Sequence, residues 1–392
     1  MTNIEPHVEI YDVEKIAKPT YGNAGRIALV GAFPTATFKL DLFTELKEAK
    51  NALVGSYKDP KDYSIENASK EDVPSTYTAY YCLDYIFNNS KKNHGAESVV
   101  IVNTNYGKST LVTESSNTDI ANAFVLLAEE EFDILNIAEP ITLAKTVNET
   151  LVLNPICETI KSFVDSQYVN QKPFGLISGF DLTGATTAIV QEFNDLFADK
   201  GIFKAVSTPV RINGDAEALN IAQSGAWHAA YTAGRQVNLS ETAKVYDGII
   251  GENTKDIFPM TGTITWKKLL DAGFHTTKYK NRRDGTIQCL SNVTPAGYDM
   301  KIERVKNYII KRLTLSDALG EDNNGITRDY VRGMFEFEKN TAIQNKYLVD
   351  MEYVLKTVET DKVTADLKLY IPDIIRVVVL NVSLEITAYE ED

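Results

Sequence analysis

Apolar and polar residues alternate along the C-terminal end of the chain, from Leu380 to Thr387. A period of two predicts a β-strand with one buried face and one solvent-facing face. A shorter strand of the same kind is predicted at the other end, over residues 7–13. Most terminal strands join a sheet of their own chain, but such strands can also add to the sheet of a neighbouring copy through backbone hydrogen bonds. The apolar positions of the two strands are Val8, Ile10, Val13, Leu380, Val382, Leu384 and Ile386.

Between these ends, the first half of the chain alternates buried strands with amphipathic helices. This order predicts an α/β layer with a largely parallel or mixed sheet. Residues 1–25 lack a helical period and predict an extended N-terminal arm, so the outer α/β domain is expected over 26–245. The expected strands are 26–33, 98–103, 134–137, 175–179 and 203–209, and the expected helices are 75–88, 119–131, 151–169 and 185–197.

The pattern changes after about residue 245 and predicts an inner α+β domain over 246–372, followed by a C-terminal strand arm over 373–392. The predicted fold is therefore an α/β outer domain plus an α+β inner domain, with extended β-strand arms at both termini. The expected elements of the inner domain are a strand-like stretch over 263–267, a hairpin over 278–290 that turns at Asp284-Gly285, helices over 300–315 and 327–347, and a strand over 362–371.

Composition and charge argue against several classes of function. The 392 residues carry a net charge of −14, which argues against general nucleic-acid binding. The longest apolar run, 374–380, is short and contains Arg376, so we expect no membrane insertion. The N-terminus lacks the basic and apolar regions of a secretory signal. Three widely spaced cysteines indicate buried thiols in a reducing compartment; they are Cys82, Cys157 and Cys289.

Charge is unevenly distributed along the chain. Residues 265–312 contain eleven Lys and Arg against four Asp and Glu, a net +7, so the rest of the chain carries −21. The helix expected from Met300 has one apolar face and one basic face, and the basic face holds Lys301, Arg304 and Lys311. A charged helix face is commonly just solvated, but a basic face in an acidic protein is also a candidate contact with an acidic partner.

Motifs for catalysis or cofactor binding are weak. Gly107-Lys108-Ser109-Thr110 follows a strand, but a phosphate loop needs a glycine where this chain has Val102, so we interpret the segment as a turn. The four histidines are scattered, and His228 is expected in the core. Small residues on one helical face of 225–235 indicate tight packing. We therefore predict a protein that is not an enzyme and that has no catalytic residues, cofactor or metal.

The order of these features resembles the tail sheath proteins of contractile phages and tailocins. The resemblance is carried by the strand 27–33 after an extended arm, the helix 79–88 with the strand 98–103, the small-residue segment 226–235, the stretch 269–274 and the helix 302–309. The similarity is strongest over Lys368 to Val382. The chain departs from the family after the small-residue segment, where it has Arg235-Gln-Val-Asn instead of an Arg-Gly pair.

This resemblance implies a structural subunit that assembles with itself as stacked hexameric rings around an inner tube and contracts to drive the tube through a target envelope. Each terminal arm would add a strand to a neighbouring copy, so the seven apolar arm residues would form the inter-subunit contacts. The other implied partners are the inner tube protein and the baseplate and tail terminator proteins, without nucleic acid. The implied location is a virion tail or an extracellular contractile particle, assembled in a bacterial or archaeal host cytoplasm.

The basic face of the helix from Met300 is the first candidate for the tube-facing surface, and the helix from Thr327, with Arg328 and Arg332, is the second. Two alternatives to the sheath function remain. A soluble two-domain α/β enzyme would have a cleft lined by convergent polar groups with shifted pKa values. Another tail or surface-layer structural protein would use the same strand exchange.

Overall fold

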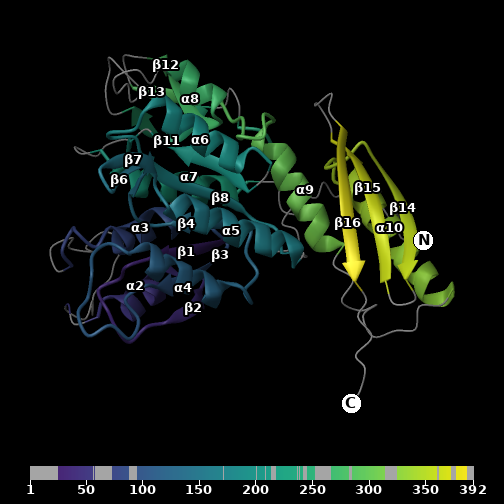
Figure 1. Ribbon diagram of the computed structural model, residues 1–392, viewed down its shortest axis with the longest axis horizontal. Helices are drawn as coiled ribbons and strands as arrows, with labels where there is room; N and C mark the ends of the chain where they lie inside the picture. The colour runs from purple at the N-terminus through teal and green to yellow at the C-terminus, as the bar shows by residue number, and fades with distance from the viewer. Residues whose placement is uncertain are drawn as a thin grey trace, which may run out of the picture.

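The computed structural model describes two lobes that are joined by one helix (Figure 1). The larger lobe is built on an 11-stranded sheet, and the smaller lobe contains a three-stranded sheet covered by a helix. The described residues are 25–55, 57, 73–87, 95–170, 172–199, 201–207, 209–212, 218–235, 237, 239–241, 245–251, 266–281, 285–313, 325–359, 362–371 and 377–385.

The centre of the large sheet is parallel, and its edges are antiparallel. The parallel strands are β1 (Arg26–Gly31), β3 (Ser98–Asn103), β4 (Ile134–Ile137), β8 (Gly175–Asp181), β9 (Ile202–Val206) and β12 (Phe274–Asn281). The antiparallel strands are β2 (Leu40–Phe43) at one edge and β13 (Thr286–Ser291), β11 (Val245–Gly251) and β10 (Val210–Ile212) towards the other. The remaining strands are β5 (Ile141–Thr142), which pairs with β8, and the hairpin of β6 (Ala144–Val147) and β7 (Thr150–Leu153).

Helices cover both faces of this sheet. Alternate residues of each central strand therefore enter two different cores, which explains why these strands are continuous apolar runs. In β1, for example, Ala28 and Val30 belong to one core, and Ile27 and Leu29 belong to the other. The first core is covered by α4 (Asn117–Leu127), α5 (Ile156–Val169), α6 (Thr187–Phe197) and α8 (Trp266–Asp271), and the second by α2 (Leu46–Leu53), α3 (Thr78–Phe87) and α7 (Ile221–Ala233).

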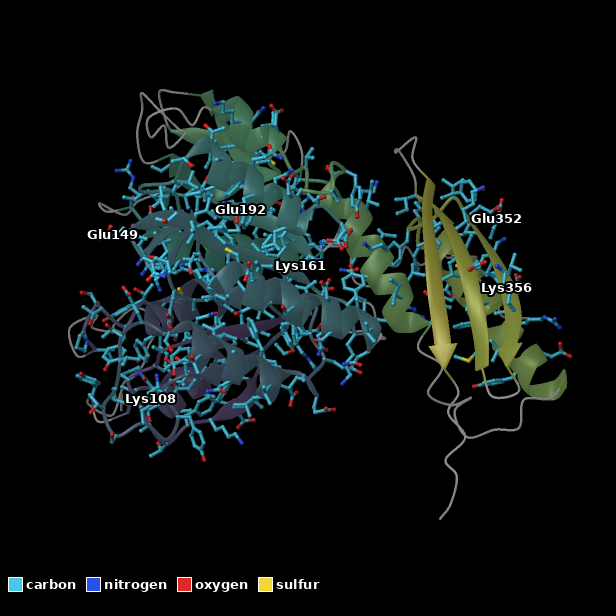
Figure 2. All side chains as sticks on the ribbon, in the orientation of Figure 1. Lys108, Glu149, Lys161, Glu192, Glu352 and Lys356 are labelled. Carbon is cyan, nitrogen blue, oxygen red and sulfur yellow. The ribbon has the colours of Figure 1, made fainter. Side chains whose placement is uncertain are left out.

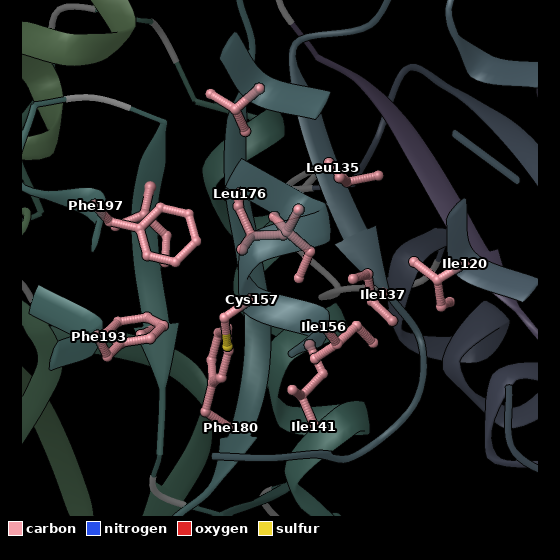
Figure 3. Packing of buried hydrophobic residues seen from close by; sticks show 14 of the residues in the cluster. Ile120, Leu135, Ile137, Ile141, Ile156, Cys157, Leu176, Phe180, Phe193 and Phe197 are labelled. Atoms are coloured by element: carbon pink, nitrogen blue, oxygen red, sulfur yellow. The ribbon is translucent and has the colours of Figure 1, made fainter. Parts of the chain in front are cut away.

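Aromatic side chains fill the first core between the sheet and α6 (Figure 3). The ring centroids of Phe180 and Phe193 lie 5.1 Å apart, and those of Phe193 and Phe197 lie 5.0 Å apart. Cys157 is a buried free thiol in the same cluster. Cys82 and Cys289 are also buried free thiols, as the sequence predicted.

The small lobe follows the last strand of the large sheet. The helix α9 (Met300–Arg312) connects the lobes, and α10 (Gly325–Gln344) packs on the sheet formed by β14 (Asp350–Glu359), β15 (Lys362–Tyr370) and β16 (Val377–Glu385). The domain boundary expected near residue 245 therefore lies inside the large sheet. The hairpin of β12 and β13 turns at Gly285 as predicted, but it extends the first lobe because β12 pairs with β9.

Several other elements differ from the sequence prediction. Residues 150–153 form β7 and not the start of a helix, so α5 begins only at Ile156. Trp266 begins the helix α8, although 263–267 has a strand-like pattern. Strand β14 was not predicted, because its exposed positions include Val354, which interrupts the alternation of apolar and polar residues. The turn lies at residues 104–107, so only Gly107 of the predicted turn Gly107-Lys108-Ser109-Thr110 belongs to it, and 109–110 form a bend.

The helix α7 approaches the sheet unusually closely at its small residues. A Cβ atom added to Gly225 would lie 2.4 Å from the backbone nitrogen of Gly179 in β8. The tight packing predicted for 225–235 is therefore confirmed, and the glycine is required because no side chain fits between the helix and the strand.

A buried polar cluster lies where the antiparallel strands join the parallel part of the sheet. The Lys204 ammonium forms an ion pair with Glu241, and both side chains are at most 1% exposed. The Tyr246 hydroxyl donates to Glu241 over 2.9 Å and lies 3.1 Å from Nε2 of His275. His228 is 1% exposed, as expected for a core histidine, and its ring centroid lies 4.6 Å from that of His275.

This cluster keeps its histidines neutral. Burial and the positive charge of Lys204 lower the pKa of His275 to about 3. Burial, together with the charges of His275 and Lys204, also holds the pKa of His228 well below its usual value. For Glu241, burial alone would raise the pKa, but the charge of Lys204 outweighs it and lowers the pKa to about 2. Each shift favours the neutral histidines and the ionised pair in the folded state.

We predict that the folded state loses stability in acid, beginning near pH 6.5. The histidines have lowered pKa values in the folded state, so the unfolded chain binds more protons below their usual value of 6.5. The free energy of unfolding should fall by up to about 1.4 kcal/mol per pH unit for each histidine. Urea unfolding between pH 8 and 5 measures this slope. A variant with His228→Gln and His275→Gln should lose it, and an unchanged slope in that variant would contradict the assignment.

A matched pair of alanine substitutions tests the close packing of α7. Gly225→Ala should destabilise the protein by about 1–3 kcal/mol, because the new methyl group overlaps backbone atoms of β8. Gly333→Ala in α10 has open space around its Cβ position, so it should stabilise the protein by about 0.5–1 kcal/mol through helix propensity. Thermal or urea denaturation compares the two. Equal effects would show that α7 tolerates a wider spacing from the sheet.

Candidate assembly interface

The small lobe carries the C-terminal strand, one of the two strands to which the sequence assigned assembly. Its core lies between α9, α10 and one face of the sheet, and includes Val305, Phe335 and Leu367. Buried and more exposed side chains alternate along the described positions of β14 and β15. Met351, for example, is buried, and Glu352 beside it is exposed. One face of the sheet is therefore used by the core, and the other faces solvent.

The solvent-facing side of this sheet is charged (Figure 2). Glu352 of β14 and Lys368 of β15 form an ion pair at 3.5 Å. Further along the same two strands, Lys356 of β14 forms an ion pair with Asp366 of β15. Exposed pairs of this kind are weak, so they affect the register and solubility of the sheet more than its stability. Val354 is the exposed apolar residue among them, at 57%.

The predicted C-terminal strand exists and pairs antiparallel with β15 of its own chain. The register sets Leu380 opposite Leu367, Val382 opposite Ala365 and Leu384 opposite Val363. Leu367 and Ala365 are both buried, so Leu380 and Val382 pair with residues of the core face of β15. Ile386 and the N-terminal residues Val8, Ile10 and Val13 lie outside the described residues. Exchange of these strands between subunits is not tested by one chain and stays a prediction.

Both outer strands of the small sheet have an unpaired edge within the described residues. The strand order is β14-β15-β16, so β14 and β16 each pair on one side only. β14 spans ten residues and therefore presents a long row of backbone donors and acceptors. Such an edge is a template for an added strand.

The sequence predicted an exposed basic face on α9, but the structure shows these side chains to be largely buried. Arg304 is 0% exposed and Lys301 is 6% exposed, and Lys311 donates to the backbone carbonyl of Phe132 in the large lobe. Burial lowers the pKa of both Arg304 and Lys311. The sequence shows a basic stripe but cannot show that the large lobe covers it. In this conformation, the stripe is unavailable to a tube protein.

The second candidate helix, α10, does present an exposed face. Tyr330 and Phe337 are 47% and 66% exposed and lie two turns apart on the same side of the helix. The Arg332 side chain is 59% exposed and pairs with Asp329 at 2.7 Å. Arg328 lies in the first turn of α10. The opposite side of the helix is buried through Val331, Phe335 and Ala342.

A carboxylate fills the crevice in which parallel α/β sheets usually bind ligands. The chain runs from β1 to β3 on one side and then to β4 on the other, so the switch point lies beyond the carboxyl ends of β1 and β4. There Glu139 accepts hydrogen bonds of 2.6 Å from the backbone nitrogens of Ala32 and Ser115 and from the Ser115 hydroxyl. Burial raises the pKa of Glu139. The backbone donors that would hold an anionic ligand are thus occupied by the chain itself.

Two further searches of the described residues bear on function. No group of three or more His, Cys, Asp or Glu side chains among them is placed to hold a metal ion. None of the helices in that part of the chain has the length and apolar character to cross a membrane.

Comparisons with known proteins give structural matches only. No family model matches the chain, and no curated protein sequence matches it. A sheath tail protein from Desulfitobacterium hafniense has a similar crystal structure, with a TM-score of 0.61 and 13% sequence identity, over 97% of this chain and 100% of that one. A sheath tail protein from Listeria innocua matches with a TM-score of 0.63 and 12% identity, over 94% and 96% of the two chains.

These matches extend through both lobes, so they concern the whole arrangement and not a common α/β core alone. They confirm at the level of the fold the resemblance found in the sequence. Over nearly its whole length, this chain has the fold of tail sheath proteins.

Proposed function

We propose that this protein is the sheath subunit of a contractile tail, which assembles as stacked hexameric rings around an inner tube and contracts to drive that tube through an envelope. One observation carries the proposal: the similarity to two sheath tail proteins covers at least 94% of every chain compared. An enzyme that shared only the α/β sheet would leave the small lobe unmatched. The Glu139 carboxylate occupies the backbone donors at the switch point of the large sheet, so this site gives no support to the enzyme alternative.

Strand exchange through the small lobe is the proposed linkage between subunits. The unpaired edge of β14 and the hairpin of β15 with β16 support it, because both use backbone hydrogen bonds that any copy of the chain can supply. In this proposal, the C-terminal strand leaves its own β15 and takes the same register on a neighbouring copy, and the N-terminal arm adds at β14. A link made by backbone bonds persists while whole lobes rotate, so contraction requires no nucleotide.

The exposed face of α10 is the proposed contact with the tube. The aromatic residues Tyr330 and Phe337 lie along one side of its exposed surface, and the cation Arg332 lies on the other flank, while Val331 and Phe335 fix the helix in the core. Aromatic and arginine side chains are enriched at protein interfaces. An exposed ion pair such as that of Arg332 and Asp329 is weak and easily exchanged for a partner.

We predict that the purified chain forms hollow cylinders or rings that depend on the C-terminal strand. The variant Leu380→Pro with Val382→Pro removes two backbone donors from β16 and should abolish these polymers. Asn381→Ser in the same strand keeps the backbone donor and should leave them intact. Negative-stain electron microscopy is the measurement. A discrete oligomer that is unaffected by the proline variant would contradict the sheath function.

Substitutions in α10 should weaken binding to the tube without unfolding the protein. Arg332→Glu and Phe337→Ser change side chains that are 59% and 66% exposed, so the thermal midpoint should stay within a few degrees. Val354→Ser on the opposite side of the small lobe is the matched control, since it removes a similarly exposed apolar residue. Co-sedimentation with assembled tubes compares the variants. If Val354→Ser reduces binding as much as Phe337→Ser, α10 is not the contact.

A further inference from the structure

The helix α9 is buried on all sides, but its two sides are chemically different. Towards the small lobe it presents an apolar face that packs against α10 and the sheet. This face consists of Ile302, Val305, Tyr308, Ile309 and Leu313, each no more than 5% exposed. The Arg312 guanidinium at its C-terminal end adds a 2.5 Å ion pair with Glu338 of α10.

Towards the large lobe, α9 presents charged and polar groups. The Tyr168 hydroxyl of α5 donates to Oε1 of Glu303 over 2.6 Å, and the Lys306 ammonium pairs with the same oxygen at 2.5 Å. The Lys306 nitrogen also lies 5.3 Å from the centre of the Tyr168 ring. Glu303 and Lys306 are only 1% and 4% exposed.

The same polar side continues along the helix. Arg304 lies 3.8 Å from the carboxylate of Asp133 and donates to the backbone carbonyl of Arg235 over 3.1 Å. Lys311 donates to the carbonyl of Phe132, in the turn before β4. The interface between α9 and the large lobe is therefore built from hydrogen bonds and ion pairs along most of its length.

The two interfaces respond differently to separation. Opening the apolar face exposes hydrocarbon surface to water, and nothing replaces the packing that is lost. Opening the polar face lets water take over each hydrogen bond and rehydrates buried ions, which recovers the desolvation cost that burial imposed. The polar face is therefore the easier one to open.

The N-terminal end of α9 supplies a pivot. Met300 is fully buried in the second core of the large lobe, and Asp299 accepts a 2.6 Å hydrogen bond from the Ser240 hydroxyl. Just before them, Gly297 has a φ of +79° and open space around its Cβ position. The start of the helix is thus held by the large lobe. Its later turns contact that lobe through the polar groups described above, and Val237 of the large lobe joins the apolar cluster around the helix.

We propose that the polar face of α9 is a built-in joint: α9 moves with the small lobe as one body, pivots near 297–300 and separates from α5 and the turn before β4. This joint belongs to the single chain and goes beyond the proposed assembly. In a sheath, it would let the large lobe change its tilt while the strand-linked small lobe stays in place.

Distances between spin labels on the two lobes test this joint in the full-length chain. Val125→Cys in α4 and Val354→Cys in β14 place labels at sites that are 72% and 57% exposed. The three native cysteines are buried, so labelling is selective. Pulsed electron paramagnetic resonance of the monomer should show a main distance and a minority longer one, on the order of a few per cent.

The variant Tyr168→Phe removes the hydroxyl that contacts both Glu303 and Asn307 of α9, and it should raise the minority population about fivefold. The matched control is Tyr353→Phe, which removes the 2.8 Å hydrogen bond from Tyr353 to Glu336 inside the small lobe and should change nothing. A single distance in all three proteins, or an equal shift in the control, overturns the joint. Failure to form cylinders would count against the sheath function alone, because these distances are measured in the monomer.

Discussion

A helix between two lobes must satisfy two different neighbours, and α9 does so with an apolar and a polar side. Because α9 lies between the lobes, its position determines where the small lobe lies relative to the large sheet in this conformation. The polar side is stabilised by partners from both the large lobe and the helix itself: Tyr168 and Lys306 contact Glu303, and the Phe132 carbonyl accepts from Lys311. A buried charge without a partner would cost several kcal/mol, so helix and lobe are mutually dependent.

The large lobe uses an architecture that often binds ligands but closes the usual ligand site. Glu139 takes the backbone donors at the switch point of the parallel sheet, and the Ser115 hydroxyl binds the same carboxylate. The histidines are likewise held neutral inside the cluster of Lys204 and Glu241. The polar groups of this lobe thus bind one another and not a ligand.

The small lobe, like the large sheet, has edge strands whose backbone groups are unpaired on one side within the described residues. Its sheet has charged pairs on one face and the core on the other, which leaves the strand edges as the places where a further strand can add. The register of β16 on β15 fits a strand supplied by the same chain or by another copy, because backbone pairing does not distinguish them. Specificity in such an exchange comes from the apolar positions that face the core.

The sequence by itself determined the elements that depend on local periodicity. Strands β3 and β4 begin and end at the predicted residues, and the hairpin turns at Gly285. Leu380 and Val382 of the terminal strand pair with the core residues Leu367 and Ala365. Close packing at Gly225 and the burial of His228 also followed from the residues alone. These features rest on interactions between near neighbours or on residue size, which the sequence shows directly.

Only the tertiary structure decided where the large sheet ends and which way the basic stripe of α9 faces. The sequence pattern of β12 and β13 is compatible with many sheets. Their place beside β9 depends on the pairing of residues that lie about seventy positions apart in the chain. Arg304 appears as a surface residue in the sequence because charge normally faces water. It is buried because Asp133 and the Arg235 carbonyl, distant in the chain, are brought to it by the fold.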